Sequence, residues 1–161
     1  MKVYLLLHNI RSLHNVGSIF RTADGMSAEK VYLTGYTQEP RDMFGQLRKD
    51  FAKSALGAEK YVAWEKVKNI SALIKKLKKE KIFIAALEQS KKAIPINSFS
   101  NRVAKAGTAL ILGNEVRGIP KSVLQASDAV LEIPMFGKKE SLNVSVAAGI
   151  ALYALRFSRR T

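Results

Sequence analysis

The feature that most constrains the fold of this chain is a series of short, continuous apolar runs separated by segments with helical periodicity. This order is typical of strands joined by crossover helices in a mostly parallel sheet. Because the runs do not alternate apolar and polar residues, helices are expected on both faces of the sheet. The sequence therefore predicts an α/β fold. The expected strands are residues 3–7, 30–33, 61–63 (the weakest), 82–87, 108–112 and 129–133.

The lysine-rich segment at about residues 65–79 is the clearest predicted helix. Val67, Ile70, Ile74 and Leu77 fall on one stripe, and lysines occupy most of the remaining surface. The lysine face either binds phosphates or keeps the helix surface in water, and the second role is the commoner one. Residues 91–105, which contain Pro95, are predicted to form an irregular surface connection.

A second predicted helix, residues 141–157, is small and apolar nearly all the way round. Such a helix must be buried on more than one side. In a domain of this size one side can face the sheet, and the other side needs a partner. We therefore expect a homodimer that uses this helix. The length of 161 residues is that of one domain.

The charge of the chain points to a polyanionic partner. It carries 27 Lys and Arg against 13 Asp and Glu, a formal net charge of +14. Because the basic residues are spread along the chain, nucleic acid is favoured over a membrane surface. A basic enzyme whose charge matters little is the alternative.

Cysteine is absent, which excludes disulfides, a thiolate nucleophile and Cys-ligated zinc. The two histidines, His8 and His14, do not suffice for a metal site, so we expect no metal. The apolar run at residues 3–7 is too short for a signal peptide, and no stretch has the length of a membrane span. We expect a cytoplasmic protein without a membrane partner.

The first candidate site segment follows the first expected strand. Asn15 and Gly17 suit a tight turn from strand to helix, and Arg21 comes six residues after Asn15. Backbone N–H groups and the Arg21 guanidinium can converge there on a phosphate. Taken alone, Arg21 is more often an ordinary surface arginine. The chain has neither of the Gly-rich ATP and NAD fingerprints, which disfavours those cofactors.

The second and third candidate segments also follow expected strands. The run at residues 108–112 leads into Gly113, Asn114 and Glu115, where ligands of parallel sheets bind. A plain turn before a helix that begins at Pro120 explains this segment equally well. After residues 129–133 comes a loop, with Ser141 predicted as a helix N-cap and residue 143 in the first turn.

Together these segments resemble the SpoU family of RNA ribose 2′-O-methyltransferases, the TrmH-like members of the SPOUT superfamily. The family pattern is Asn-x-Gly-x-x-x-Arg, then Gly-Asn-Glu-x-x-Gly after an apolar strand, then Ile-Pro-Met … Ser-Leu-Asn-Val-Ser. The chain matches it at residues 15–21, 113–118, 133–135 and 141–145. Residues 53–58 also match the family's Lys-x-x-x-Gly-Ala stretch. The resemblance covers essentially the whole chain.

The resemblance implies a single SPOUT methyltransferase catalytic domain over residues 1–161, without a separate RNA-binding extension. It also implies a C-terminal deep trefoil knot, S-adenosylmethionine as the cofactor, and a dimer. The implied cofactor-binding residues are Leu87, Gly113, Asn114, Ile133, Met135, Ser141 and Leu142. The implied substrate is structured RNA, either tRNA or rRNA, held by Arg11, Arg21, Arg41, Arg48, Lys53 and Arg117.

In the family, the arginine that matches Arg21 accepts or activates the proton of the ribose hydroxyl. A guanidinium with a pKa of about 12.5 or more is a poor base and a good phosphate clamp. Our hypothesis is that Arg21 binds the phosphate beside the target ribose. The implied catalytic set is Asn15, Arg21, Glu115, Ser141 and Asn143. A catalytically silent RNA-binding homologue is the alternative, although such a protein is free to lose these polar residues.

Overall fold

A computed structural model describes residues 2–100 and 104–157 and shows an α/β fold built on a seven-stranded sheet. Every pairing between the strands is parallel, so all carboxyl ends lie along one edge. The strand order is β3-β2-β1-β6-β4-β7-β5. The strands are β1 (Val3–His8), β2 (Lys30–Thr34), β3 (Trp64–Val67), β4 (Phe83–Leu87), β5 (Ile94–Pro95), β6 (Thr108–Leu112) and β7 (Ala129–Glu132).

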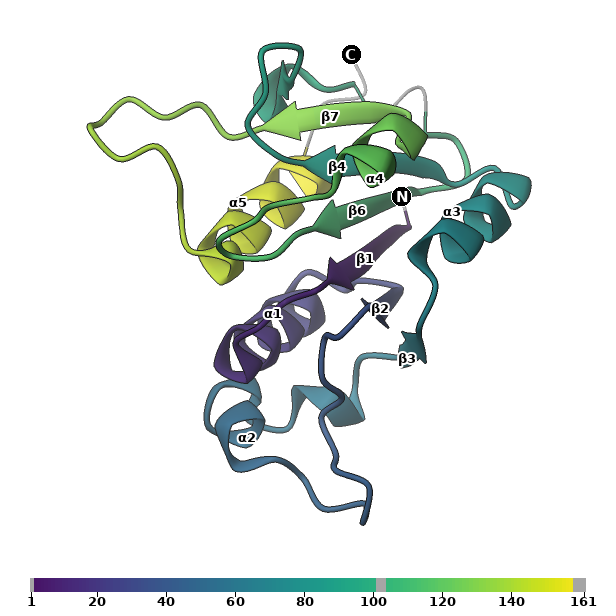
Figure 1. The fold of residues 1–161 in the computed structure, drawn as a ribbon, viewed down its shortest axis with the longest axis vertical. Coiled ribbons are helices and arrows are strands. Elements are labelled where there is room, and N and C mark those ends of the chain that lie inside the picture. Colours follow the sequence, from purple (N-terminus) through teal and green to yellow (C-terminus); the bar gives the residue numbers. More distant parts are fainter. Residues whose placement is uncertain (1, 101–103, 158–161) are drawn as a thin grey trace.

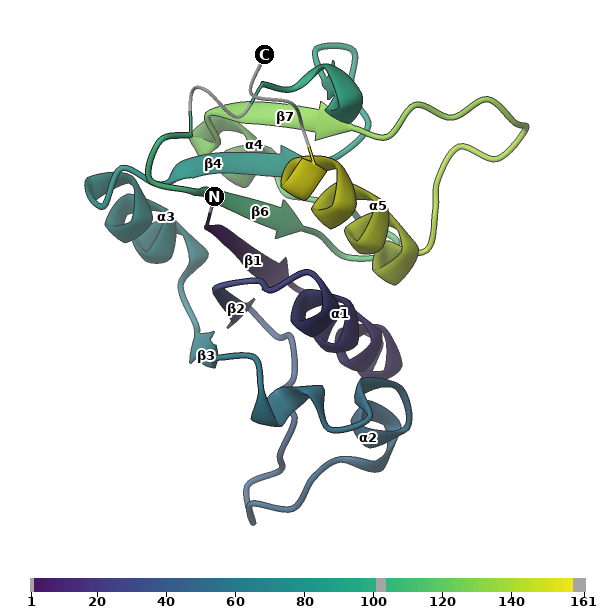
Figure 2. The same ribbon diagram turned by 180° about the vertical axis from the view of Figure 1, so that it is seen from behind.

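Helices cover both faces of the sheet, as the continuous apolar runs predicted (Figures 1 and 2). On one face, α1 (Leu13–Gly25) packs between α2 (Lys49–Ala55) and α5 (Val144–Phe157). On the other face lie α3 (Ile70–Lys79) and α4 (Lys121–Ala126). Each face has its own apolar core, in which the central strands contribute alternate residues to the two sides. The α/β fold class is therefore confirmed, and the trefoil knot stays a prediction.

The predicted third strand and the start of the lysine-rich helix are wrong. Residues 61–63 follow a 3₁₀ turn, η1 (Ala58–Lys60), and the strand is β3 instead. Two charged residues of β3 explain the error, because Glu65 forms an ion pair with Lys30 (2.6 Å) and Lys66 donates to backbone carbonyls of the loop after β2. The helix begins only after Asn69, whose Oδ1 accepts from the backbone N–H of Ala72 (3.1 Å).

The predicted surface connection at residues 91–105 contains more order than expected. It includes the short edge strand β5 and the 3₁₀ turn η2 (Ile96–Ser98), and Ile96 and Phe99 are buried in the core. Residues 101–103 of this connection lie outside the described residues. The strand-forming part was missed because it comprises only two residues, one of them a proline, at the end of the sheet.

Asn15 and Gly17 do not form the predicted tight turn, because both lie inside α1. The turn is made by Asn9, which has a positive φ of 57°, and the helix is capped by Ser12, whose Oγ accepts from the backbone N–H of Asn15. Gly17 instead allows close contact between α1 and α2. A Cβ at this position would approach the Phe51 carbonyl oxygen to 2.5 Å and would collide with Ser54 Oγ.

Helix α5 starts three residues later than predicted, and Ser141 is an exposed loop residue rather than its cap. The capping side chain is Asn143, whose Oδ1 accepts from the backbone N–H of Ser145 (2.9 Å). An amide oxygen can cap a helix as well as a hydroxyl can, which explains the shift. Within residues 2–100 and 104–157, no helix is long and apolar enough to cross a bilayer.

The close approach of α1 and α2 predicts a position-specific glycine effect. We expect Gly17→Ala to lower the free energy of unfolding by about 1–3 kcal/mol, because the backbone of α2 must move away from the new methyl group. Gly25→Ala is the matched control, since nothing lies within 4 Å of a Cβ there. Its expected change is within about 0.5 kcal/mol. Urea unfolding followed by circular dichroism measures both values, and equal effects would contradict the assignment.

Candidate active site

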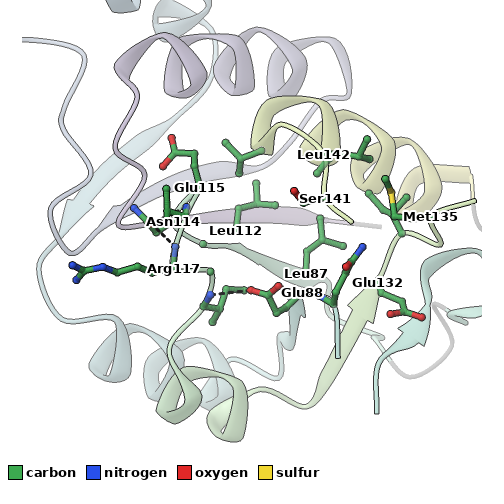
Figure 3. Close-up of a pocket in the computed structure, with 18 residues that line it drawn as sticks. Leu87, Glu88, Leu112, Asn114, Glu115, Arg117, Glu132, Met135, Ser141 and Leu142 are labelled. Carbon is green, nitrogen blue, oxygen red and sulfur yellow. Dashed lines mark hydrogen bonds between the residues drawn. The ribbon is translucent and has the colours of Figure 1, made fainter. Parts of the chain in front are cut away.

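A cavity of about 410 Å³ opens at the edge of the sheet where the strands end (Figure 3). It lies among the segments that follow β4, β6 and β7, and the first turn of α5 closes one side. Because the pairing is parallel throughout, segments far apart in the sequence meet here. A concave site of this volume is in the range that binds a cofactor or other small molecule.

All seven residues predicted to bind a cofactor line this cavity, namely Leu87, Gly113, Asn114, Ile133, Met135, Ser141 and Leu142. The structure thus brings together the second and third motifs and Leu87 at the end of β4, and the cofactor role of these residues stays a prediction. Leucine and isoleucine side chains form much of the wall, while Asn114, Glu115 and Ser141 add polar groups. A wall of this mixed kind can hold a flat apolar ring and orient a polar tail.

Three of the predicted catalytic residues form one chain of hydrogen bonds beside the cavity. Asn143 Nδ2 donates to Asn15 Oδ1 (3.2 Å), and Asn15 Nδ2 donates to Glu115 Oε1 (3.2 Å). The Glu115 carboxylate also accepts from the backbone N–H groups of Arg11 and Ser12, both at 3.0 Å. The three motifs of the sequence are therefore physically connected at their polar residues.

The carboxylate fixes the direction of this chain. An ionised carboxylate only accepts hydrogen bonds, so Asn15 must turn its amide nitrogen toward Glu115. Its oxygen then faces Asn143 and receives the Asn143 amide nitrogen. The Asn143 oxygen is left to accept from the backbone N–H and the hydroxyl of Ser145. Each amide has one orientation that satisfies all of its neighbours.

Glu115 is held in its ionised form. Its partial burial raises the pKa of the carboxyl. Hydrogen bonds to the carboxylate have the opposite and together larger effect on the pKa. They come from the backbone of Arg11, Ser12 and Glu115 itself and from the Asn15 side chain. The net pKa is below the ordinary value. Because both oxygens already accept hydrogen bonds, Glu115 is suited to positioning other groups and is a poor proton acceptor.

Asn114 forms a second connection across the same edge. Its Nδ2 donates to the backbone carbonyl of Asn9 (3.0 Å) and to the hydroxyl of Tyr36 (2.8 Å). Its Oδ1 accepts from the backbone N–H groups of Val116 and Arg117. Asn114 therefore fixes the shape of its own loop and ties that loop to the ends of β1 and β2.

Glu88 is a cavity residue that the sequence analysis did not identify. Its Oε2 accepts from the backbone N–H of Ile119 (3.0 Å), which holds the loop after β6 against the end of β4. Gly118, with a φ of 66°, allows this approach, because a Cβ there would collide with Glu88 Oε2. The position of Glu88 directly after the predicted strand at residues 82–87 was the sequence signal that could have identified it as a site residue. Glu132, at the end of β7, is a second acidic residue of the wall that was missed.

Five of the six predicted RNA-binding residues divide into two groups, and Arg21, the sixth, lies apart from both on α1. Arg11 and Arg117 are exposed beside the site, and their backbone N–H groups belong to its hydrogen-bond network. Arg41, Arg48 and Lys53 lie in the segment formed by α2 and the loop before it, on the far side of α1 from α5. The Arg41 guanidinium donates to the Gly45 carbonyl, and Lys53 forms an exposed ion pair with Asp50 (3.6 Å).

Two predicted catalytic residues do not join the network within one chain. Arg21 is exposed on α1, does not line the cavity, and makes no hydrogen bond or ion pair with any described residue. Ser141 lines the cavity, but its side chain has no hydrogen-bond partner among residues 2–100 and 104–157. Their catalytic roles stay predictions.

The model of the SpoU rRNA methylase family matches residues 2–153 of the chain. A protein of Bacillus subtilis that is assigned to the TrmH family of tRNA/rRNA methyltransferases is 30% identical over 150 residues, which cover 93% of this chain and 56% of that protein. The chain spans 56 to 62% of the length of the first curated relatives that it matches.

The solved structures with this fold include RNA-modifying enzymes. A TrmH/SpoU tRNA-modifying enzyme of A. aeolicus superposes with a TM-score of 0.82 at 28% identity, covering 98% of this chain and 75% of that one. A structure described for 2-OH methylation of C/U34 on tRNA has a TM-score of 0.76 at 25% identity, covering 94% and 92%. An AdoMet-bound rRNA methyltransferase from Sinorhizobium meliloti shares the fold, with a TM-score of 0.85 at 24% identity over 96% and 56%.

The lowered pKa of Glu115 predicts a specific pH dependence of stability. The carboxylate contributes its full stability at pH values above the ordinary carboxyl pKa. This contribution is lost as the pH falls through the lowered pKa of the folded state. Near neutral pH we expect Glu115→Gln to lower the free energy of unfolding by about 1 kcal/mol. The amide nitrogen cannot accept, so one of the donors that now bind the carboxylate loses its partner. The difference should shrink as the solution is acidified.

Urea titrations at several pH values measure this dependence. Glu140→Gln is the matched control, since Glu140 is exposed and makes no hydrogen bond with a described residue. A Glu115→Gln variant as stable as the wild-type protein at every pH would show that the hydrogen bonds of the carboxylate contribute nothing.

Proposed function

The chain belongs to the SpoU rRNA methylase family, and we propose that it transfers a methyl group from S-adenosylmethionine to a ribose 2′-hydroxyl of structured RNA, either tRNA or rRNA. The observation that supports this proposal is the cavity beside the Asn15–Glu115–Asn143 network, where all three sequence motifs meet. The structure described for 2-OH methylation on tRNA is matched over nearly the whole length of both chains, and its description supports the ribose as the acceptor. We further propose that residues 1–161 form one catalytic domain.

The residues of the cavity fit S-adenosylmethionine, the cofactor of SpoU methyltransferases. Leu87, Ile133 and Leu142 would pack against the adenine ring, and the acidic Glu88 and Glu132 favour a ligand that carries positive charge. When bound, S-adenosylmethionine supplies an electrophilic methyl group on a positively charged sulfur. Gly113 and Met135 would complete the site, with the methionine filling an irregular gap.

The residues of this chain must hold the ribose in line with the methyl group and help to remove one proton. Glu115 orients Asn15 through a carboxylate whose acceptor sites are already used, which makes Glu115 a positioning residue. Asn143, through its contact with Asn15, holds the start of α5 at the site. Ser141, which has no side-chain partner among the described residues, would donate a hydrogen bond to a bound ligand.

Arg21 has the role of phosphate clamp in this proposal. Its guanidinium binds the phosphate beside the target ribose, and the 2′-hydroxyl proton passes to that phosphate or to a transiently neutral Arg21. The exposed side chain, without a partner among the described residues, supports a role toward a ligand. Arg11 and Arg117 would contact neighbouring phosphates at the rim of the cavity.

We also propose that the protein acts as a homodimer through α5. The buried face of this helix is formed by Val144, Ala148, Ala151, Leu152 and Leu155. A second apolar stripe, Val146, Ile150, Tyr153 and Phe157, is 41 to 62% exposed. This spacing places the four side chains on one face of the helix, and the Tyr153 and Phe157 rings lie 4.6 Å apart. Covering such a continuous stripe would remove apolar surface from water.

The proposed reaction is tested by transfer of a labelled methyl group from S-adenosylmethionine to bulk RNA from a strain that lacks the gene. Nuclease digestion then identifies the labelled nucleosides. We expect 2′-O-methylribose, with kcat/KM lowered about 100-fold or more in Arg21→Ala, in line with the loss of proton-transfer assistance. Activity retained in Arg21→Lys would indicate that positive charge alone suffices. Label on a base would contradict the ribose assignment, and cofactor and RNA binding without transfer would favour a silent homologue.

The dimer is tested by light scattering at micromolar concentration. We expect twice the mass of the chain for the wild-type protein and a shift toward the monomer in Tyr153→Glu, because the substitution places a charge in the covered stripe. Lys75→Glu, on the exposed face of α3, changes charge elsewhere and should leave the mass unaltered. A monomeric wild-type protein would contradict the proposal.

A further inference from the structure

Tyr36 lies in a turn that is fixed on both sides at the carboxyl edge of the sheet. The turn follows β2, and its first residue, Gly35, has a φ of 59° and packs so tightly on Asn9 that a Cβ would collide with the Asn9 side chain. The backbone N–H of Tyr36 donates to Asn9 Oδ1 (3.0 Å). The Lys66 ammonium donates to the carbonyl oxygens on either side, those of Gly35 and Thr37. The backbone at Tyr36 is therefore held in one conformation.

The next residue, Thr37, completes this frame. Its side chain is fully buried, and its hydroxyl donates to the Leu7 carbonyl (2.7 Å) and accepts from the backbone N–H of Ile10 (3.0 Å). These bonds join the turn after β2 to the end of β1. The segment directly after β1 contains Arg11 and Ser12, whose backbone N–H groups bind Glu115. Tyr36 is thus part of the same rigid edge as Asn9 and Arg11.

The Tyr36 side chain is anchored at its tip although the residue is more than half exposed. Its hydroxyl accepts from Asn114 Nδ2 (2.8 Å), while the residue is 56% exposed. The same Asn114 orients the backbone N–H of Arg117. An aromatic ring fixed at backbone and tip has lost its rotational freedom before any ligand arrives, so little entropy remains to be lost on binding. The exposed part of the residue is then available to a ligand.

We propose that Tyr36 is the base-stacking platform of the RNA site, on which an unpaired base next to the methylated ribose lies. This inference rests on the proposed function. Unpaired RNA bases are recognised by stacking on fixed aromatic rings, and neighbouring cations hold the backbone. Arg11 and Arg117 supply exposed cations from the two segments that Tyr36 contacts through Asn9 and Asn114. The net charge of +14 favours RNA over a protein partner of ordinary charge.

The chain contains a matched control. Tyr61 is 78% exposed, more than Tyr36, and its hydroxyl has no hydrogen-bond partner among the described residues. It precedes β3 and therefore lies toward the amino ends of the strands, at the edge opposite the cavity. The two tyrosines share side-chain chemistry and are both more than half exposed, and they differ in their anchoring and in their position relative to the site.

The test measures methyl transfer to bulk small RNA from a strain that lacks the gene, together with calorimetric binding of S-adenosylmethionine. We expect Tyr36→Leu to raise the KM for RNA about 10-fold or more, in line with the loss of one stacked base. Affinity for S-adenosylmethionine should stay within twofold. Tyr36→Phe keeps the ring and should restore most of the affinity for RNA, while Tyr61→Leu should behave as the wild-type protein does.

An unchanged KM for RNA in Tyr36→Leu, or an equal loss of RNA affinity in Tyr36→Phe, would overturn the inference while leaving methyl transfer intact. A change in the mass of the oligomer in Tyr36→Leu would also overturn it, because it would place the ring at a protein interface. A wild-type protein that neither binds nor methylates RNA would remove the proposed function and Tyr36 with it. If Tyr36→Leu does not fold, a benzophenone amino acid in place of Tyr36 provides the readout. It should crosslink to RNA under ultraviolet light, and the same group in place of Tyr61 should not.

Discussion

The carboxylate of Glu115 is the group on which the order of the active site depends. It accepts from two backbone N–H groups at the start of α1 and from the Asn15 amide, and so joins the loop after β6 to the first helix. Because a carboxylate offers only acceptors, it also determines which way the amides of Asn15 and Asn143 face. A neutral side chain of similar size would leave these orientations open. One charge therefore defines the polar pattern that a ligand meets.

The parallel sheet gives this group its setting. Because every strand runs in the same direction, the loops after β1, β2, β4, β6 and β7 all begin at one edge of the sheet. Two separate cores stabilise the two faces. Beside the apolar residues of the cavity wall, hydrogen bonds between side chains and backbone groups fix the conformation of these loops. Glu88, Asn114 and Lys66 each bind backbone groups of a neighbouring loop and supply this order.

Much of the fold was predictable because the buried central strands are continuous apolar runs. The prediction for residues 108–112 matches β6 without error, and those for β1, β2, β4 and β7 differ only at their ends. The edge strand β3 was missed because its middle residues are charged and make contacts that depend on tertiary structure. Likewise, Asn69 and Asn143 replace the expected start and cap of their helices, since several polar residues nearby have similar capping ability.

The site was predictable to the extent that it consists of motif residues. The seven cofactor candidates meet at one cavity, whereas Tyr36 and Glu88 escaped notice because their roles arise from contacts with residues distant in sequence. Arg21 shows the opposite case, since a motif places it near Asn15 in sequence, yet its side chain does not line the cavity of its own chain.

The bond between Asn143 and Asn15 connects side chains 128 positions apart. Closing so long a stretch of chain costs more conformational entropy than forming a local contact does. During synthesis on the ribosome, β1 and α1 emerge long before α5, so the nascent chain carries its first motif without the partner that completes it. The network of Asn15, Glu115 and Asn143 is therefore complete only once α5 has docked, and a nascent chain without α5 already carries positive charge that attracts RNA.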